Sequence, residues 1–419
     1  MHRRNTRNRR ITRVAVIGTA ATAALAGMLA GPLTGTALAD GTTTADVTWT
    51  VANTDATGDQ DTSEVSATRN GYTAVVWEDD RDTTAPEDTL HTEVYLRLYK
   101  DGTSLYEKQL STGGSGNWRH VQPDVALHDD GTAVVIWAED PDGNGYYNIT
   151  VRAVNTAGTV TGSAQANADS TGQQLNAHVA ADPDTAGFAV AFEDVQTGTE
   201  PTVRLSGYAS ISSKTYEVQV NTAGGTHHRP DVAQDAVGNA IVVWDEDGDG
   251  NGSYNVGRKV YTPSGGVKVA QTIANVATAG DQDRPSVAAN FNGDYVVAWE
   301  TTQNGTAQVG ARSFSAANVA GPEVILPGAD PQAGIDDQRR AVVAWAQGAD
   351  VYAQGLNVDG TSTGRLPQLR VHTTIAGKQD EPALGVNAWG QIVIAYTDDH
   401  DGNTFDQVYL GTGLVNSTW

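Results

Sequence analysis

The chain has 419 residues and no Cys, with 50 Asp and Glu against 26 Lys and Arg, so its formal net charge is −24 at pH 7. The lack of Cys excludes disulfides, thiol catalysis and thiolate metal sites. A strongly acidic surface repels phosphate backbones, so we expect no nucleic acid among the partners.

The first 39 residues predict an export signal. A basic stretch that includes Arg9 and Arg10 precedes an apolar run from Val14 to about Gly31, and Ala37-Leu38-Ala39 fits a small-x-small cleavage site. The alternative is a membrane anchor, because the run is nearly long enough to span a bilayer. The polar chain that follows favours a removed signal and a secreted, extracellular protein. The general secretory and twin-arginine routes both stay open.

Loss of this signal removes six Lys and Arg and no Asp or Glu, so the mature chain carries a net charge of −30. No later segment is apolar enough to cross a bilayer, so we expect no membrane span after signal removal. About 380 residues without disulfides must be held together by burial. We expect residues 40–419 to form one domain and a monomer.

One pattern recurs along the mature chain: a P-x-V-A segment, a turn that contains Gly, and an apolar run that ends in an aromatic residue. Clear copies begin at Pro123, Pro230 and Pro285. Seven aromatic residues end the copies, spaced 46–60 residues apart: Trp77, Trp137, Phe192, Trp244, Trp299, Trp345 and Tyr396.

Each copy divides into four short strands separated by turn residues. Seven such units predict an all-β, seven-bladed β-propeller with four antiparallel strands per blade. A string of small β-sandwiches is the alternative, but units of about 50 residues could not each close a core without disulfides.

The two ends of the repeat array predict how the ring closes. The segment Asp46–Asn53 aligns with a fourth strand, and no first three strands precede it. The last copy ends after about three strands, near Val408–Leu410. We therefore expect the N-terminal strand to complete the last blade, which removes two open sheet edges.

The repeat resembles the blades of bacterial secreted propellers of the sialidase-like (BNR-repeat) kind, which also open with a P-x-[VI]-A strand followed by an apolar strand ending in Trp. The resemblance covers nearly the whole mature chain and implies the fold. Sialidase Asp-box turns, S-x-D-x-G-x-T-W, are reduced here to Asp101-Gly102-Thr103 and Asp359-Gly360-Thr361. Arg229 and Arg284 match the Arg at the head of a first strand, but a third Arg and the Tyr/Glu nucleophile pair have no match. The resemblance therefore implies no sialidase activity.

Two similar acidic loops predict a calcium site. Oxygen-bearing side chains at alternate positions, with Gly between them, suit a compact Ca²⁺ loop, although the bidentate Glu of an EF-hand is missing. The alternative is a long hairpin made of good turn formers. The candidate ligands are Asp140, Asp142, Asn144 and Asn148 in one loop, and Asp247, Asp249, Asn251 and Asn255 in the other.

The segments that link the blades supply a second candidate site. They should point towards the mouth of the central channel, where carboxylate, His and Arg groups could bind a polar ligand or transfer protons. The alternative is that they bond one blade to the next. The candidate ligand-binding residues are Asp61, His120, His178, His227, His228, Arg229, Asp283, Arg284 and Glu381.

Two classes of function follow from these features. The first is a non-catalytic binding protein that presents its acidic, loop-rich face to an extracellular glycan, a cell-wall component or a protein. The second is a secreted glycoside hydrolase or lyase with carboxylates at the channel mouth, which requires two carboxyl groups facing each other across a cleft. The catalytic residues of such an enzyme are not identified by the sequence.

Overall fold

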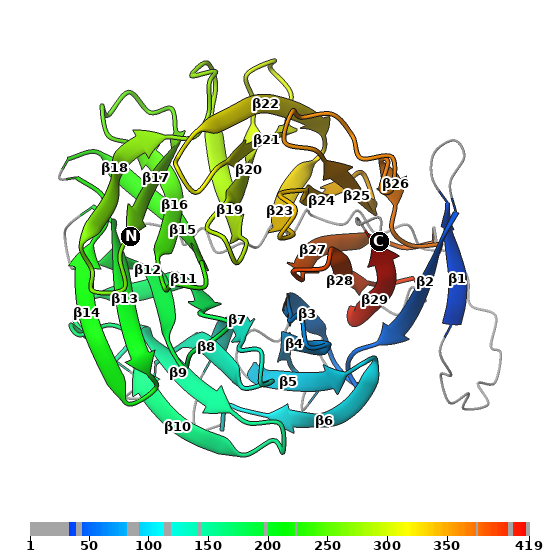
Figure 1. The fold of residues 1–419 in the computed structure, drawn as a ribbon. Helices are drawn as coiled ribbons and strands as arrows, with labels where there is room; N and C mark the ends of the chain where they lie inside the picture. Colours follow the sequence, from blue (N-terminus) through cyan, green and yellow to red (C-terminus); the bar gives the residue numbers. More distant parts are fainter. Residues whose placement is uncertain are drawn as a thin grey trace, which may run out of the picture. The chain divides into compact units, whose positions relative to one another are not determined.

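The computed structural model describes residues 33–38, 44–81, 92–112, 119–140, 144–196, 200–222, 224–373, 376–400 and 405–415. Within these ranges every regular secondary-structure element is a β-strand. Figure 1 shows the strands grouped into seven sheets around a central opening, as predicted for a seven-bladed propeller. No helix in the described ranges is long and apolar enough to cross a membrane.

Six blades follow the chain directly, each with its first strand at the channel and its fourth at the rim (Figure 1). The first three blades are β3 (Gln60–Ala67), β4 (Tyr72–Asp79), β5 (Glu93–Lys100) and β6 (Thr103–Gln109); β7 (His120–Leu127), β8 (Ala133–Glu139), β9 (Asn148–Val154) and β10 (Val160–Gln165); and β11 (Gln173–Ala181), β12 (Phe188–Val195), β13 (Thr202–Ser210) and β14 (Ser213–Gln219). The next three are β15 (Thr226–Gln234), β16 (Ala240–Asp247), β17 (Asn255–Tyr261) and β18 (Val267–Ile273); β19 (Gln282–Ala289), β20 (Tyr295–Thr301), β21 (Gln308–Phe314) and β22 (Ala320–Pro327); and β23 (Ala329–Ile335), β24 (Ala341–Gln347), β25 (Asp350–Leu356) and β26 (Leu369–Arg370).

The seventh blade joins the two ends of the chain, as predicted. It contains β27 (Gln379–Val386), β28 (Gln391–Asp398) and β29 (Gln407–Val415), and β2 (Thr44–Val51) pairs antiparallel with β29. Thr50 lies opposite Leu410, and the Ala52 N–H donates to the Val408 carbonyl over 2.7 Å. The N-terminal strand therefore covers the open edge of the last blade.

The outermost strand of this sheet, β1 (Leu33–Leu38), lies within the predicted export signal and pairs with β2. Cleavage after Ala39, as the sequence predicts, would remove β1 and leave the seventh blade with four strands like the other six. The basic part of the predicted signal lies outside the described residues.

Seven apolar clusters hold the ring together, one between each pair of neighbouring blades. Every second strand carries a nearly continuous apolar run because another blade packs on each of its two faces. The outer strand β18, in contrast, is mostly exposed. The seven aromatic residues that end the repeats are all at most 2% exposed, which confirms that they belong to the interblade core.

Glycines on the third strand make room for two of the indoles. Gly257 lies opposite Trp244, and Gly310 lies opposite Trp299. A Cβ at either glycine would collide with the indole ring. The pairing of a terminal Trp with a Gly 11 or 13 residues later is thus a packing requirement of these blades.

We predict that Trp244→Ala lowers the free energy of unfolding by roughly 3–5 kcal/mol, because it opens a cavity between the third and fourth blades. Val237→Ala is the control, since this side chain is 69% exposed and its loss should change stability by about 0.5 kcal/mol or less. Chemical denaturation measures both. A loss below about 1 kcal/mol for Trp244→Ala would contradict the packing described here.

Candidate functional site

The strand topology places two sets of connections on one face. In each antiparallel blade the first strand begins where the second strand ends, so the second-to-third loops and the interblade linkers lie at the same end of the channel. We call this end the mouth. The other end, where the first and second strands join, is called the exit.

A left-handed residue marks the mouth end of every first strand. Each sits at a β-bulge, two residues before the pairing resumes, with φ between 44° and 56°. Non-Gly residues rarely adopt this conformation, and surrounding bonds must hold it. The seven residues are Thr62, Gln122, Asn176, Arg229, Arg284, Asp330 and Glu381.

At six of these seven positions the bulge turns the backbone N–H towards the preceding blade, where a side-chain oxygen accepts it. The Arg229 N–H donates to Glu193 over 2.6 Å, and the Arg284 N–H donates to Asp245 over 2.7 Å. Glu78 and Glu300 accept in the same way from their following blades. These four carboxylates follow the terminal aromatic residue directly.

Where that carboxylate is absent, a different side chain accepts the N–H of the left-handed residue. Ala138 follows Trp137, and there the Gln122 side chain accepts the Asn176 N–H over 2.9 Å. At the joint between the last and first blades, Glu381 accepts the Thr62 N–H over 3.1 Å. The sequence analysis did not identify these side chains as acceptors of the backbone N–H groups. The signal for them was an acidic residue immediately after the terminal aromatic residue in four of seven repeats.

Arg229 and Arg284 at the mouth are each held by two carboxylates. The Arg229 side chain lies 2.5 Å from Asp245 and 3.2 Å from Asp283. Burial raises the pKa of Asp245 to about 7; the Arg229 charge opposes this shift and the Asp283 charge adds to it. Arg284 lies 3.5 Å from Glu300 and 3.4 Å from Asp330. The mouth thus carries a chain of ion pairs across the fourth, fifth and sixth blades.

Below the mouth a polar ring lines the upper part of a channel cavity of about 260 Å³. Six blades contribute to it through Glu64, Asp124, His178, Asp231, Ser286 and Gln332. Next along the channel, the wall is built from small residues such as Ala126, Ala180, Ala233 and Gly334.

His178 lies between two carboxylates in this ring. Its Nδ1 is 3.2 Å from Asp124 and 3.7 Å from Asp231. Each aspartate also bridges to the next blade, since Asp124 accepts the Val179 N–H and Asp231 accepts the Val287 N–H. Burial raises the pKa of Asp231, and the Asp124 charge adds to the shift, although the His178 charge opposes it.

The exit is covered by one arginine. Arg69 in the first blade ion-pairs with Asp129 and Asp184, and its guanidinium lies 4.9 Å from the Phe291 ring centroid of the fifth blade. The Trp389 indole of the seventh blade donates to the Arg69 carbonyl over 3.2 Å. Arg69 therefore reaches across part of the exit, where Asp129, Phe291 and Asp337 also line the channel cavity.

The structure separates the predicted mouth residues into two groups. Those of the first group lie at the mouth end of the first strands: Asp61, His178, His228, Arg229, Asp283, Arg284 and Glu381. The second group is His120 and His227, each 1% exposed. His120 contacts Glu93 and Glu139, and His227 contacts Glu246 and the Gly224 carbonyl. These two imidazoles support the linkers and do not face the mouth, because they occupy the positions of buried glutamines in other blades.

The described part of the two acidic loops shows how their side chains are used. The carboxylate of Asp140 accepts the N–H groups of Asn144 and Gly145, and Asp247 makes the same bonds to the loop residues four and five positions later. The Asn148 side chain accepts from Asn167 over 2.7 Å. Asn255 accepts from Asn275, and the Asn251 amide donates to Asp249.

These contacts engage the described candidate oxygens in hydrogen bonds within the loops and to neighbouring side chains. The candidate oxygens face hydrogen-bond donors, and in the described ranges no group of three or more Asp, Glu or His side chains could hold a metal. Asp142 lies outside the described residues. The loops are built as capped turns, and calcium binding stays a prediction.

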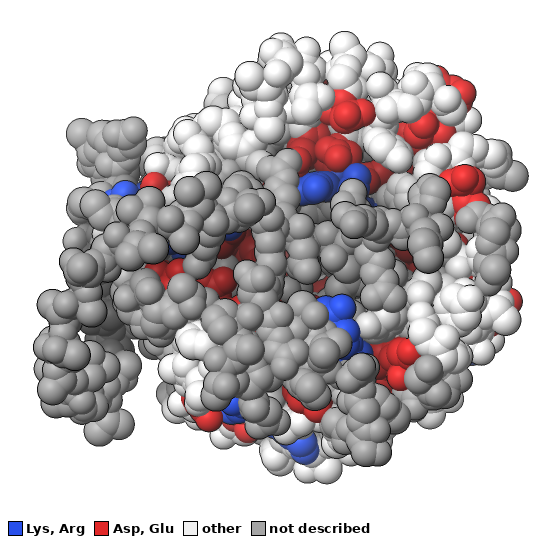
Figure 2. All heavy atoms as spheres, turned by 180° about the vertical axis from the view of Figure 1, so that it is seen from behind, with Lys and Arg blue, Asp and Glu red and all other residues white. Residues whose placement is uncertain are grey.

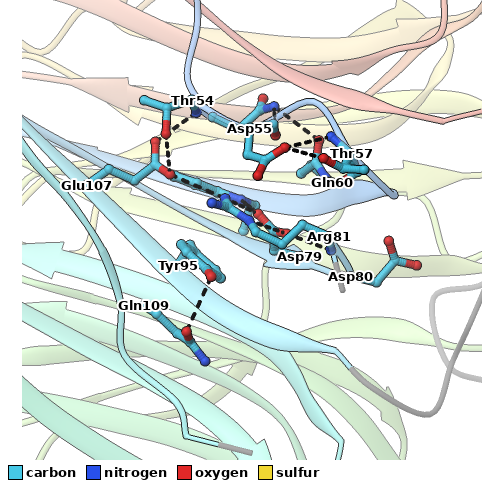
Figure 3. Close-up of polar contacts among 12 residues, drawn as sticks. Thr54, Asp55, Thr57, Gln60, Asp79, Asp80, Arg81, Tyr95, Glu107 and Gln109 are labelled. Carbon is cyan, nitrogen blue, oxygen red and sulfur yellow. Dashed lines mark hydrogen bonds and ion pairs between the residues drawn. The ribbon is translucent and has the colours of Figure 1, made fainter. Parts of the chain in front are cut away.

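Side-chain hydrogen bonds and ion pairs also connect the outer strands to the linkers, as Figure 3 shows for the first blade. Glu107 accepts the Thr54 N–H and hydroxyl, each over 2.8 Å. Arg81 lies between Asp79 and Glu107, with its guanidinium 3.9 Å from the Tyr95 ring centroid. Arg81 therefore pairs with Glu107, the residue that holds Thr54 in the linker that follows the closing strand.

In sequence, no protein-family model and no curated protein matches the chain. In structure it is similar to the polysaccharide lyase Uly1, with 12% identity, 85% of this chain and 90% of that chain covered, and a TM-score of 0.53. A protein of unknown function from Dyadobacter fermentans matches with 12% identity, 87% and 96% coverage and a TM-score of 0.51. A PL25 ulvan lyase bound to -[GlcA(1-4)Rha3S]- matches with 11% identity, 85% and 94% coverage and a TM-score of 0.50.

Sialidases are also among the solved structures that match, with TM-scores below 0.5. At such identities the likeness is one of fold, and it leaves activity open. The sialidase-like resemblance predicted from the repeat is confirmed at the level of the seven-bladed propeller.

We predict that the protein is less stable at pH 7.5 than at pH 5.5. The folded state raises the pKa of Asp245 and of Asp406 to about 7, from an ordinary value of 3.8, mainly by burial. Such groups bind more protons when folded, so stability falls as pH rises between these values. His120 and His227, whose pKa is also raised, act in the same direction above their ordinary value.

Thermal unfolding at the two pH values measures this difference. Asp245→Asn should reduce it, whereas Asp130→Asn at an exposed exit turn should leave it unchanged. A melting temperature that rises with pH in the parent protein would contradict the burial of these carboxyls.

Proposed function

We propose that this chain is a secreted β-propeller that binds an extracellular glycan at the channel mouth without transforming it. The observation that carries the proposal is the channel cavity of about 260 Å³, which has polar side chains from six blades at its mouth end. Concave sites with a few fixed polar groups are typical of small-ligand binding. Because the polar ring lies at the mouth end of this cavity, the proposed entry side for a chain end is the mouth.

The choice of a glycan has support from the fold. Two neighbours of similar architecture are named polysaccharide lyases, and one of them was solved with a uronate-containing sugar bound. Hydroxyl-rich ligands also suit the hydrogen-bonding ring formed by Ser286, Gln332 and the channel carboxylates. Export through the predicted signal would bring the protein to such ligands.

The non-catalytic reading rests on how the mouth carboxylates are used. One oxygen of Asp245 accepts the Arg284 N–H and the other accepts from the Arg229 side chain. Glu193 likewise accepts from the Arg229 backbone and from Asn176. Carboxylates committed to interblade bonds are poorly placed to move during a reaction.

One observation favours the enzyme as the second candidate. The pKa of about 7 at Asp245 suits a general acid at neutral pH. Asp245 is, however, 0% exposed and lies beneath Arg229. Catalysis would therefore require the Arg229 side chain to move away from it.

A glycan array, combined with reducing-sugar and unsaturated-uronate assays on the same panel, tests the proposal. We expect saturable binding to one glycan class and no product. Gln332→Ala should weaken binding about tenfold, which corresponds to one lost polar contact of about 1.4 kcal/mol. Gln338→Ala, an exposed glutamine at the exit end of the same blade, is the matched control.

Two results would contradict the proposal. Release of reducing ends or unsaturated uronate would make the protein an enzyme. No binding to any glycan on the panel would remove the glycan as ligand.

Calcium binding is tested separately, by melting the chelator-treated protein with and without millimolar Ca²⁺. An ion that binds only the folded form stabilises it by about 2.7 kcal/mol at 100-fold Kd. A calcium site therefore predicts a higher Tm, and the double variant Asp142→Asn with Asp249→Asn should lose most of the rise. An unchanged Tm would leave the two loops as capped turns only.

A further inference from the structure

We propose that the channel mouth is selective for glycans that carry protonated amines, and that it rejects glycans rich in carboxylate or sulfate. This inference rests on the proposed function and adds the chemical class of the ligand. It follows from how the positive charges of the mouth are already matched, and from which charges line the cavity behind them.

Arg229 and Arg284 at the mouth are not available as anion receptors. Arg229 is held between Asp245 and Asp283, and Arg284 is held between Glu300 and Asp330. Two guanidinium groups thus face four carboxylates. An anionic sugar would have to displace a carboxylate from an ion pair and would meet the other as a like charge.

The imidazoles at the mouth are matched in the same way. His228 lies 3.5 Å from Glu193, and His178 lies between Asp124 and Asp231. Even with both histidines protonated, the carboxylates named at this end of the channel outnumber the cations. Figure 2 shows Asp and Glu in several groups on one face of the molecule, with Lys and Arg beside only some of them.

The cavity extends this negative field to the place where a ligand would sit. Glu64, Asp124 and Asp231 line the same cavity from the first, second and fourth blades, and His178 is the one basic group in the ring that they share with Ser286 and Gln332. Cavity walls of low polarisability focus such a field and raise the local concentration of cations. Arg69 at the exit does not reverse the field, because Asp129 and Asp184 neutralise it.

The size and wall of the cavity suit one sugar residue carrying an amine. Its volume of about 260 Å³ lies just under the ~300–1,000 Å³ range of small-molecule sites. The Ala and Gly residues of the channel wall leave room for a ring, and an ammonium group can make charge-assisted hydrogen bonds to carboxylates. Burial raises the pKa of Asp231, and the Asp124 charge adds to the shift, so an entering cation would favour the ionised form of this carboxylate.

Isothermal titration with four hexasaccharides tests the inference: glucosamine, N-acetylglucosamine, glucose and galacturonate oligomers. We expect the glucosamine hexamer to bind at least tenfold more tightly than its N-acetylated form, and the galacturonate hexamer not to bind. The advantage of the amine should shrink between 50 and 300 mM salt, because charge attraction at a solvent-open mouth is screened.

Two variants connect this preference to the cavity. Glu64→Gln should weaken binding of the glucosamine hexamer about tenfold. Asp101→Asn is the matched control in the same blade, since this carboxylate is 71% exposed at the other end of the sheet and its left-handed backbone is one that Asn tolerates. Asp231→Asn gives a second reading from another blade.

The outcomes separate this inference from the proposed function. If a neutral or anionic hexamer binds as tightly as the glucosamine hexamer, or if Glu64→Gln and Asp231→Asn leave the preference unchanged, the amine class is wrong and glycan binding stands. If no hexamer binds, both are wrong.

Discussion

Every part of this protein depends on one constraint: a four-stranded blade cannot bury its own core. The second strand of each blade carries apolar side chains on both faces, so both faces need a neighbour. The seven interblade clusters meet this need only if the ring is closed. Closure in turn requires β2, since without it the edge of β29 stays open. Interblade packing therefore requires a closed ring, and the closed ring requires β2 to pair with β29.

The same constraint creates the mouth. Apolar packing holds the middle of each joint, but the channel ends need polar bonds because backbone groups there lose their ladder partners. Left-handed bulges aim those N–H groups at carboxylates of the preceding blade, as in the bonds from Arg229 to Glu193 and from Arg284 to Asp245. A ring of joints built this way gathers carboxylates around the channel. The charge that we assign to ligand selection thus arises from the way the blades are joined.

The sequence was sufficient for the fold because packing leaves a periodic trace. The spacing from Trp137 to Trp244 and Trp299, with a turn before each, reports strand length and blade number directly. The unpaired segment Asp46–Asn53 likewise predicted the closing strand. These features depend on local hydrophobic patterns and on the number of repeats, both of which can be read from a single sequence.

The site was less predictable because polar roles depend on which neighbour lies across a joint. His120 and His228 occupy similar-looking linkers, yet one is buried beside Glu93 and Glu139 and the other lies near the mouth. The acidic loops match a calcium-loop pattern in sequence. In the structure, the carboxylates of Asp140 and Asp247 accept backbone N–H groups of their own loops. Asp124 and Asp231 were read as part of the strand repeat, and only the ring places them on either side of His178.

The most direct measurement of this account is hydrogen–deuterium exchange with and without saturating glucosamine hexamer. Our central claim is that the joints at the mouth also form the ligand site. It predicts slower exchange at the start of the first strands, around residues 60–64, 120–124 and 227–231, with no change at the exit turns. Protection confined to the outer strands or to the exit would contradict the claim and place the binding surface elsewhere on the propeller.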